Sequence, residues 1–153
     1  MNNLPTGFHI KEITENKRRL IDLLLIGDES EQMIDRYIGR GRLFAGYFGE
    51  DAVGVCLTTD EGKGVIEIKN LAVVPEMRHR GIARAMINHV EMSNQGKTLI
   101  LGTGESPYNL NFYQGLGFVY SHRVADFFTE YYPEEIVEDG VVLRDMIYLK
   151  KQL

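Results

Sequence analysis

A chain of 153 residues, 44% of them hydrophobic, is long enough to form one compact domain with a sizeable core. Its 22 acidic residues outnumber its 17 basic ones, which gives a net charge of −5, and the basic clusters are short. This composition argues against a nucleic-acid partner and weakly favours a cationic substrate. We therefore predict a single domain over residues 1–153 that does not bind nucleic acid.

The sequence contains no segment that resembles a signal peptide or a membrane-spanning helix. The first seven residues lack the basic and apolar regions of a signal peptide, and the longest apolar run, residues 23–26, is too short to span a bilayer. The single cysteine, Cys56, excludes an internal disulfide framework and lies in an apolar run, where a buried structural thiol is expected. We predict a cytoplasmic protein without a membrane partner.

The first half of the chain has the patterns of a strand, two helices and an antiparallel meander. Apolar spacing predicts strands at 42–48, 52–59 and 65–74 after an initial strand at 8–13 and helices at 17–27 and 31–39. The second helix follows a segment at 28–31 that resembles a capping box. In the third meander strand the apolar phase slips by one residue at Lys69 and Asn70, which predicts a β-bulge.

The second half alternates between helices and strands. The expected elements are a helix at 81–93, a strand at 98–101, a helix at 108–115 and strands at 118–123 and 141–149. A strand–helix–strand order from 65 to 101 is a crossover, so these two strands should be parallel and the sheet mixed. The segment 126–140, which is rich in aromatic and acidic residues, is expected to be irregular.

The helix expected at Gly81 begins directly after a strand and a turn opened by Pro75. The first amides of a helix have no carbonyl partner and carry partial positive charge, and the small residues Gly81 and Ala83 let an anion approach them. Arg78, His79 and Arg80 add charge, so the start of this helix suits a phosphate or pyrophosphate. A plain turn with solvated arginines is the alternative. Neither the Walker loop nor the dinucleotide-binding glycine pattern is present.

The order of elements contains two motifs, Arg78-x-x-Gly81-x-Ala83 and Asn111-Phe-Tyr-Gln-Gly-Leu-Gly-Phe118. Together with that order, they resemble the motifs of the GCN5-related N-acetyltransferase (GNAT) superfamily, and the resemblance spans nearly the whole chain. It implies an α/β (α+β) fold, with a mixed, mostly antiparallel sheet of six to seven strands and helices on both faces, known as the acyl-CoA N-acyltransferase fold. It also implies acetyl-CoA as co-substrate and no metal.

The resemblance assigns cofactor-binding residues along this chain. Acetyl-CoA would bind in the slot between the two parallel strands, with its pantetheine arm on the backbone of Leu71, Ala72 and Val73. Its pyrophosphate would bind to main-chain amides of six consecutive residues, Arg78, His79, Arg80, Gly81, Ile82 and Ala83. Asn109 lies near a position that often contacts the pantetheine arm, and Ser106 stands where the family usually has asparagine.

The resemblance also indicates the catalytic groups. Tyr113 matches a tyrosine that protonates the departing CoA thiolate, and Glu67, eleven residues before Arg78, matches the base of the histone-acetylating branch. A base is needed because an amine attacks a thioester only when neutral. A water chain is the alternative base, an ion pair the alternative role for Glu67, and a core position the alternative for Tyr113. The main-chain amide near Val73 is the expected oxyanion donor.

The acceptor would bind between the first two helices and the loop that joins the last two strands. This places Asp28, Glu29, Glu31 and Tyr37 opposite the segment 127–139, whose aromatic rings and carboxylates suit a cationic amine. In the alternative, those rings pack the loop or form a dimer contact.

We therefore expect an N-acetyltransferase that transfers the acetyl group of acetyl-CoA to a primary amine of a small molecule or protein by direct attack in a ternary complex. The rival function is a catalytically silent acyl-CoA-binding sensor or regulatory module. Besides the amine substrate, the sequence leaves a homodimer open as a partner.

Overall fold

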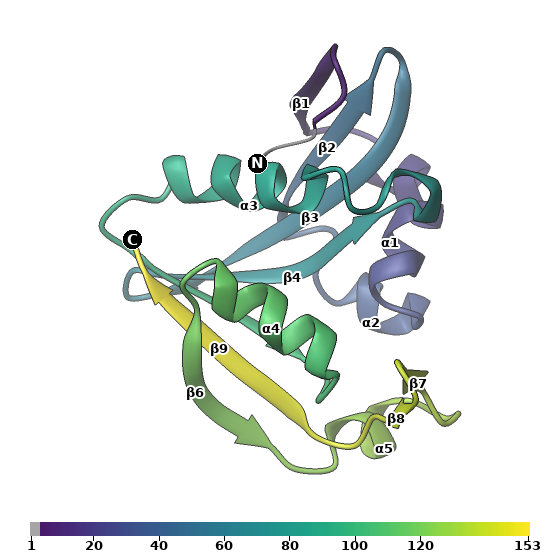
Figure 1. Cartoon of the computed structure of the whole chain (residues 1–153), viewed down its shortest axis with the longest axis vertical. Coiled ribbons are helices and arrows are strands. Elements are labelled where there is room, and N and C mark those ends of the chain that lie inside the picture. The colour runs from purple at the N-terminus through teal and green to yellow at the C-terminus, as the bar shows by residue number, and fades with distance from the viewer. Residues whose placement is uncertain (1–3) are drawn as a thin grey trace. The chain divides into compact units, whose positions relative to one another are not determined.

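The computed structural model describes residues 4–153 (Figure 1). The chain divides into two compact units, and the first unit extends to Gln95. Four antiparallel strands form the sheet of this first unit. The strands are β1 (Phe8–Ile13), β2 (Arg42–Phe48), β3 (Asp51–Gly62) and β4 (Val65–Val73). Each pairs antiparallel with the next, as the meander pattern predicts.

Helices cover both faces of this four-stranded sheet, and β2 presents apolar side chains to both because its side chains alternate between the two faces. Leu43 and Ala45 enter the core formed with η1 (Lys17–Leu20), α1 (Ile21–Gly27) and α2 (Glu31–Asp35). The intervening Phe44 points the other way, where its ring lies 5.1 Å from that of His89 in α3 (Ile82–Met92). The strand thus has one core on each side.

The α1–α2 region differs in detail from the prediction. The second helix is capped by Ser30, whose Oγ accepts from the Met33 amide at 3.2 Å, and not by Asp28. Asp28 instead accepts from the Ser30 amide at 3.1 Å, which is the hydrogen bond of an Asx turn. Both residues are good caps, and the local turn decides between them.

The predicted β-bulge in β4 is confirmed. Asn70 pairs with Leu57 and Ile68 pairs with Thr58, so Lys69 is the extra residue of the bulged strand. The β3–β4 hairpin is longer than predicted, because β3 continues to Gly62. Its turn is tight, and Gly62, Lys63 and Gly64 all have positive φ.

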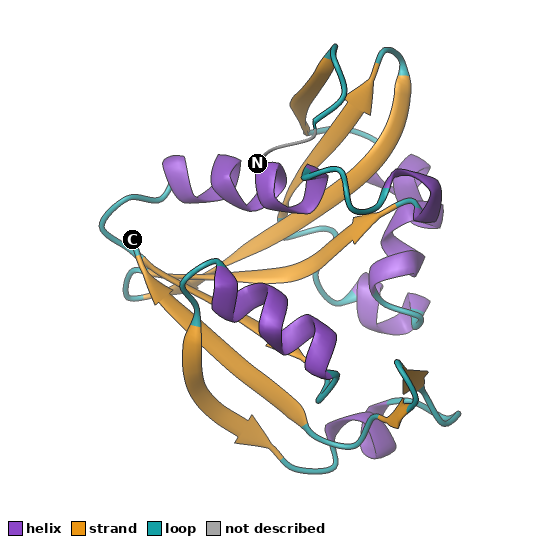
Figure 2. Cartoon of the chain, in the orientation of Figure 1, coloured by secondary structure: helices purple, strands orange, loops and turns teal. Residues whose placement is uncertain are grey.

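The second unit, from Gly96, contains a three-stranded antiparallel sheet with β9 in the middle (Figure 2). Its strands and helices are β5 (Thr98–Thr103), α4 (Pro107–Gly115), β6 (Val119–Val124), α5 (Phe127–Tyr131), β7 (Val137–Glu138), β8 (Val141–Val142) and β9 (Met146–Gln152). β9 pairs with β5 on one side and β6 on the other.

The prediction that the segment 126–140 is irregular holds only in part, because residues 132–136 have no helix or strand but their flanks do. The flanks form the short helix α5 and the first strand of a β7–β8 hairpin that turns through Asp139 and Gly140, both with positive φ. Asp-Gly is a strong hairpin-turn signal, so the sequence did contain this information. The last long strand begins at Met146 instead of Val141. Val141 and Val142 form the second strand of the hairpin, and the Leu143 side chain that follows is buried.

Candidate active site

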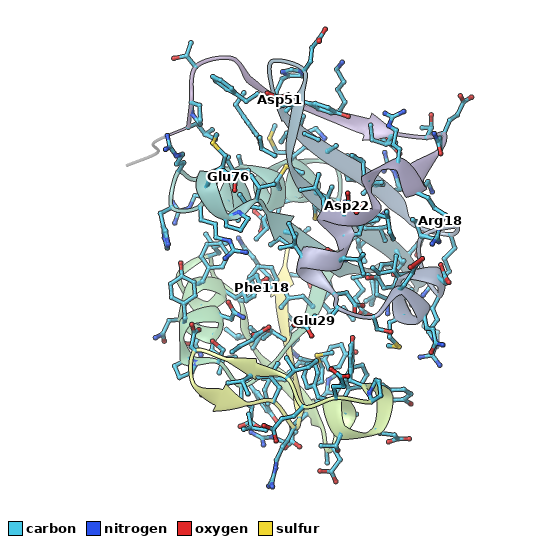
Figure 3. All side chains as sticks on the ribbon, turned by 90° about the vertical axis from the view of Figure 1, so that its right-hand side faces the viewer. Arg18, Asp22, Glu29, Asp51, Glu76 and Phe118 are labelled. Atoms are coloured by element: carbon cyan, nitrogen blue, oxygen red, sulfur yellow. The ribbon has the colours of Figure 1, made fainter. Side chains whose placement is uncertain are left out.

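The start of α3 is open to an anion. A single 3-10 turn, η2 (Pro75–Met77), joins β4 to α3, and Glu76 lies in this turn (Figure 3). Gly81 is the N-cap with φ 83°, and no side chain of the described residues caps the helix. Its first turn contains no acidic residue. The first amides of the helix therefore meet no competing carboxylate on their own helix.

Positive charge gathers at this helix start. Arg78, His79 and Arg80 are exposed, as predicted for residues that attract phosphate, and Arg84 in the first turn of α3 is exposed as well. Arg84 was not among the residues predicted from the sequence, although it stands three residues after Gly81. The Arg78 amide donates to the Pro75 carbonyl at 3.3 Å, so this one of the predicted pyrophosphate donors belongs to the η2 turn.

The predicted pantetheine stretch, Leu71–Val73, ends β4 directly before η2. It pairs with β3, where Gly54 lies opposite Val73. A Cβ on Gly54 would lie 3.2 Å from both the Ala72 carbonyl oxygen and Cγ2 of Ile82. Gly54 therefore lets the end of β4 and the first residue of α3 pack closely against β3.

Glu67, the predicted base, is a buried carboxyl with one cationic partner. It is 7% exposed, and its Oε2 lies 3.1 Å from Nζ of Lys69. Burial raises the pKa of Glu67 and Glu61 acts in the same direction, while Lys69 and Arg40 oppose the shift. A carboxylate with a raised pKa is a stronger proton acceptor, which is the property that a general base needs.

In the second unit, Tyr113 lies on α4 and is half-buried between aromatic rings. Its ring meets those of Phe112 and Phe118 edge-on, at 5.2 and 5.9 Å between centroids. Gly117, with φ 98°, turns the chain so that the Phe118 amide donates to the Tyr113 carbonyl at 3.1 Å. The motif that carries the family resemblance thus forms the C-terminal end of α4 and fixes the tyrosine ring.

The two polar side chains predicted to contact the pantetheine arm have partners in the β7–β8 hairpin. Ser106 Oγ donates to Asp139 Oδ2 at 2.6 Å, and Asn109 Nδ2 donates to Glu138 Oε2 at 3.2 Å. Ser106 is also the N-cap of α4. These bonds join residues about 30 positions apart, so sequence spacing gave no signal for them.

The predicted acceptor residues lie around the α1–α2 loop. Glu31 pairs with Arg18, with 2.6 Å between Oε2 and Nη2, and Tyr37 is buried with its hydroxyl 3.1 Å from Asp28 Oδ2. Glu29 is exposed on the loop itself, where Figure 3 labels it. Asp28 is half-buried and Glu31 is exposed but paired with Arg18, whereas no ion pair of Glu29 is found among the described residues.

The aromatic residues of the segment 127–139 contact one another. Phe127 lies 5.3 Å from Phe128, 4.9 Å from Tyr131 and 6.3 Å from Tyr132, measured between ring centroids. These contacts pack the rings of α5 together and leave the predicted role of this segment in acceptor binding a prediction.

Two further observations concern Cys56 and groups of possible metal ligands. Cys56 is fully buried, and burial raises the pKa of its thiol to about 12, so it is the structural thiol that the sequence predicts. Among residues 4–153, no three His, Cys, Asp or Glu side chains are grouped as metal ligands. Nor does any helix in this part of the chain have the length and apolar character needed to cross a membrane.

A helix start with a glycine N-cap and exposed cations, one short turn after a bulged strand, is the kind of site that can bind an anionic group such as a diphosphate. Comparison with known proteins identifies the family. The family model of the acetyltransferase (GNAT) domain matches residues 39–120. The uncharacterized N-acetyltransferase YvbK of Bacillus subtilis (strain 168) is 32% identical over 139 residues, which are 88% of this chain and 90% of that protein. The chain belongs to the GNAT acetyltransferase family.

Solved structures confirm the predicted fold class, the mixed-sheet acyl-CoA N-acyltransferase fold. A GNAT family acetyltransferase from Elizabethkingia anophelis, with acetyl-CoA bound, has a TM-score of 0.90 and 31% identity, covering 97% of this chain and 100% of its own. The IAA acetyltransferase from Bacillus cereus ATCC 14579 has a TM-score of 0.89 and 33% identity, covering 95% and 99%.

Proposed function

We propose that this protein transfers the acetyl group of acetyl-CoA to a primary amine, of a small molecule or of a protein, by direct attack in a ternary complex. The observation that carries the proposal is the start of α3, where an uncapped helix end, Gly81 and exposed cations meet in a chain of this family. The acetyl-CoA bound to the relative from Elizabethkingia anophelis supports the co-substrate.

The cofactor assignments follow from this helix start. The diphosphate binds the backbone amides between Arg78 and Ala83, and the pantetheine arm lies along Leu71–Val73. The missing side chain at Gly81 and the lack of an acidic residue in the first turn of α3 support this binding mode. Ser106 and Asn109 contact the pantetheine arm from α4, where their bonds to Asp139 and Glu138 orient them.

Two residues move protons in the proposed reaction. Glu67 accepts a proton from the attacking amine, which its raised pKa supports, as the nitrogen–carbon bond forms. Tyr113 donates a proton to the sulfur as the carbon–sulfur bond breaks. The products are an acetamide and free CoA, and the reaction needs no metal.

The remaining parts of the proposal concern the whole protein. Residues 1–153 act as one GNAT-type domain, in the cytoplasm, on an amine substrate and without nucleic acid. A homodimer remains a prediction from the sequence.

The test is thiol release from acetyl-CoA over a panel of small amines and amino-terminal peptides. We expect at least one amine to be acetylated, with a mass gain of one acetyl group and equimolar thiol. Tight CoA binding without turnover of any amine would favour the silent acyl-CoA sensor. Thermal shift with CoA, ATP and NAD then tests the site itself, since a ligand selective for the native state raises the melting temperature.

A further inference from the structure

A buried chain of hydrogen bonds links β4 to the α1–α2 loop. Asn70, the residue after the bulge, donates from Nδ2 to the Leu24 carbonyl at 2.8 Å and to Tyr37 Oη at 3.0 Å. Tyr37 Oη in turn donates to Asp28 Oδ2 at 3.1 Å. Asn70 and Tyr37 are 3% and 5% exposed, so the two bonds that Asn70 donates are shielded from water, while the bond from Tyr37 to the half-buried Asp28 is partly shielded.

The chain of bonds fixes the end of α1. The Leu24 carbonyl, in the last turn of this helix, accepts from the Asp28 amide at 2.9 Å as well as from Asn70. A carbonyl oxygen has two lone pairs, so the Leu24 carbonyl keeps its helical bond to the Asp28 amide and accepts a second bond from Asn70, which ties the end of α1 to β4. Asp28 then closes the loop by accepting from the Ser30 amide.

Gly27 brings this helix end directly onto β4. A Cβ at Gly27 would lie 2.1 Å from Asn70 Oδ1 and 3.2 Å from the Leu71 carbonyl oxygen. The first distance is shorter than real Cβ contacts allow, so a side chain here would displace the Asn70 carboxamide. The loop is therefore seated on the strand residues that begin the proposed pantetheine stretch, Leu71–Val73.

We propose that Asn70 and Tyr37 are positioning residues that hold Asp28 and the α1–α2 loop, residues 28–30, against β4, so that the loop presents the exposed Glu29 to a cationic acceptor amine. Amines arrive largely protonated near pH 7, and a carboxylate at the loop attracts them. The bulge at Lys69 and the bonds of Asn70 thus fix the position of the proposed amine-binding loop relative to β4, the strand proposed to bind the pantetheine arm.

Protonation supports the direction of the bonds. Burial raises the pKa of Tyr37, and Asp28 acts in the same direction. The tyrosine therefore remains a hydrogen-bond donor to Asp28 over the whole physiological pH range. The Asn70 Nδ2 group has two hydrogens, and it donates one to the Leu24 carbonyl and the other to the tyrosine oxygen.

The experiment measures steady-state kinetics of Tyr37→Phe, Asn70→Ala and Gly27→Ala with an amine that the wild-type protein acetylates. Tyr37→Phe removes one hydroxyl and keeps the packing. We expect the KM for the amine to rise about tenfold, as for the loss of one buried hydrogen bond. The Kd for CoA should stay within about twofold. Because the three residues act through one chain of bonds, the double variant Tyr37→Phe/Asn70→Ala should be no worse than the poorer single variant.

The matched control is Asn94→Ala. Asn94 is 8% exposed and donates from Nδ2 to the Val90 carbonyl at 2.8 Å, so it closes α3 as Asn70 closes α1. We expect this variant to lower Tm as Asn70→Ala does, without changing the KM for the amine. If both variants lower Tm and neither changes the KM, the role of Asn70 is structural and the inference is overturned.

The inference rests on the proposed acetyl transfer, and the two fail in different ways. An absence of turnover in the wild-type protein contradicts the proposed function, and the positioning role falls with it. Turnover in the wild-type protein, with CoA affinity and amine KM changed equally in Tyr37→Phe, contradicts the positioning role alone. Should Tyr37→Phe fold poorly, Asp28→Ala removes the acceptor of the same bond and should raise the amine KM alike.

Discussion

The starts of α3 and α4 are both helix N-termini that follow a strand, yet they are built for different partners. At α3 the N-cap is Gly81, within the described residues no side chain caps the helix, and Arg84 stands in the first turn. At α4 the N-cap Ser106 accepts from the Asn109 amide, and Pro107 occupies the first turn. The side chains of Ser106 and Asn109 donate to the carboxylates of Asp139 and Glu138. An unsatisfied, cationic helix end attracts an anion, whereas a capped end beside carboxylates does not.

The largest effect should come from placing a negative charge in the first turn of α3. Ala83→Glu puts a carboxylate where the diphosphate is proposed to bind, and we expect the Kd for CoA to rise about 1,000-fold, because like charges a few ångströms apart repel by about 4 kcal/mol. The helix itself should gain slight stability from the acid at its N-terminus. Calorimetry measures the affinity and thermal melting the stability.

Ala83→Gln is the control for size, since glutamine has nearly the shape of glutamate without its charge. It should weaken CoA binding far less. Equal losses with Glu and Gln would mean that crowding, and not charge, matters at this position, and would break the contrast between the two helix starts.

At α4 the expected contribution is chemical instead of electrostatic. Tyr113→Phe removes the proposed acid and keeps the ring contacts, so kcat should fall about 100-fold while the Kd for CoA is unchanged. Tyr120→Phe, at an exposed position of the same unit, is the control and should keep full activity. A Tyr113→Phe protein with wild-type kcat would leave this tyrosine a core residue.

Glu67 should set the acid limb of the pH–rate profile. Lys69 lowers the Glu67 pKa, so Lys69→Met should raise that pKa and shift the acid limb to higher pH, with a loss of rate at pH values below the limb. Lys69→Arg should restore the wild-type profile. An unchanged profile in Lys69→Met would exclude Glu67 as the titrating base.

The same carboxyl predicts a trade-off between activity and stability. Its folded pKa is raised above the ordinary 4.5, so its contribution to stability is present below that value and is lost as the pH rises through the folded pKa. Glu67→Gln should therefore lower the rate yet raise Tm at pH 7 to 8, with no gain below about pH 4. Thermal melts across this pH range test the sign.

The smallest effect concerns a single exposed cation. Arg84→Gln should raise the Kd for CoA about threefold at low salt, because one exposed charge near the diphosphate contributes little. The difference from wild type should vanish near 1 M salt, where the screening length is about 3 Å. A loss that persists at high salt would indicate a direct contact instead of attraction at a distance.

Local patterns in the sequence were sufficient for much of this protein. Alternating and helical apolar spacing gave the meander and α3, and the one-residue slip at Lys69 and Asn70 gave the bulge. Such features depend on residues near in the chain, whose periodicity is written in the sequence. The Asp139-Gly140 turn is also a local signal, and the β7–β8 hairpin that it forms was not predicted.

The family motifs likewise depend on short spacings. Arg78, Gly81 and Ala83 lie within one turn and the first residues of one helix, so their proximity follows from the chain itself. The sequence thus identified the proposed anion site and the family without tertiary information.

Only the tertiary structure decided which distant side chains meet. Asn70 reaches Leu24 across 46 positions and Tyr37 across 33, and Ser106 reaches Asp139 across 33. The burial that raises the Glu67 pKa is likewise a property of the packed sheet and not of its neighbours in sequence. Hydrogen bonds and desolvation depend on distances in space, and distances between residues far apart in the sequence are set only when the chain folds.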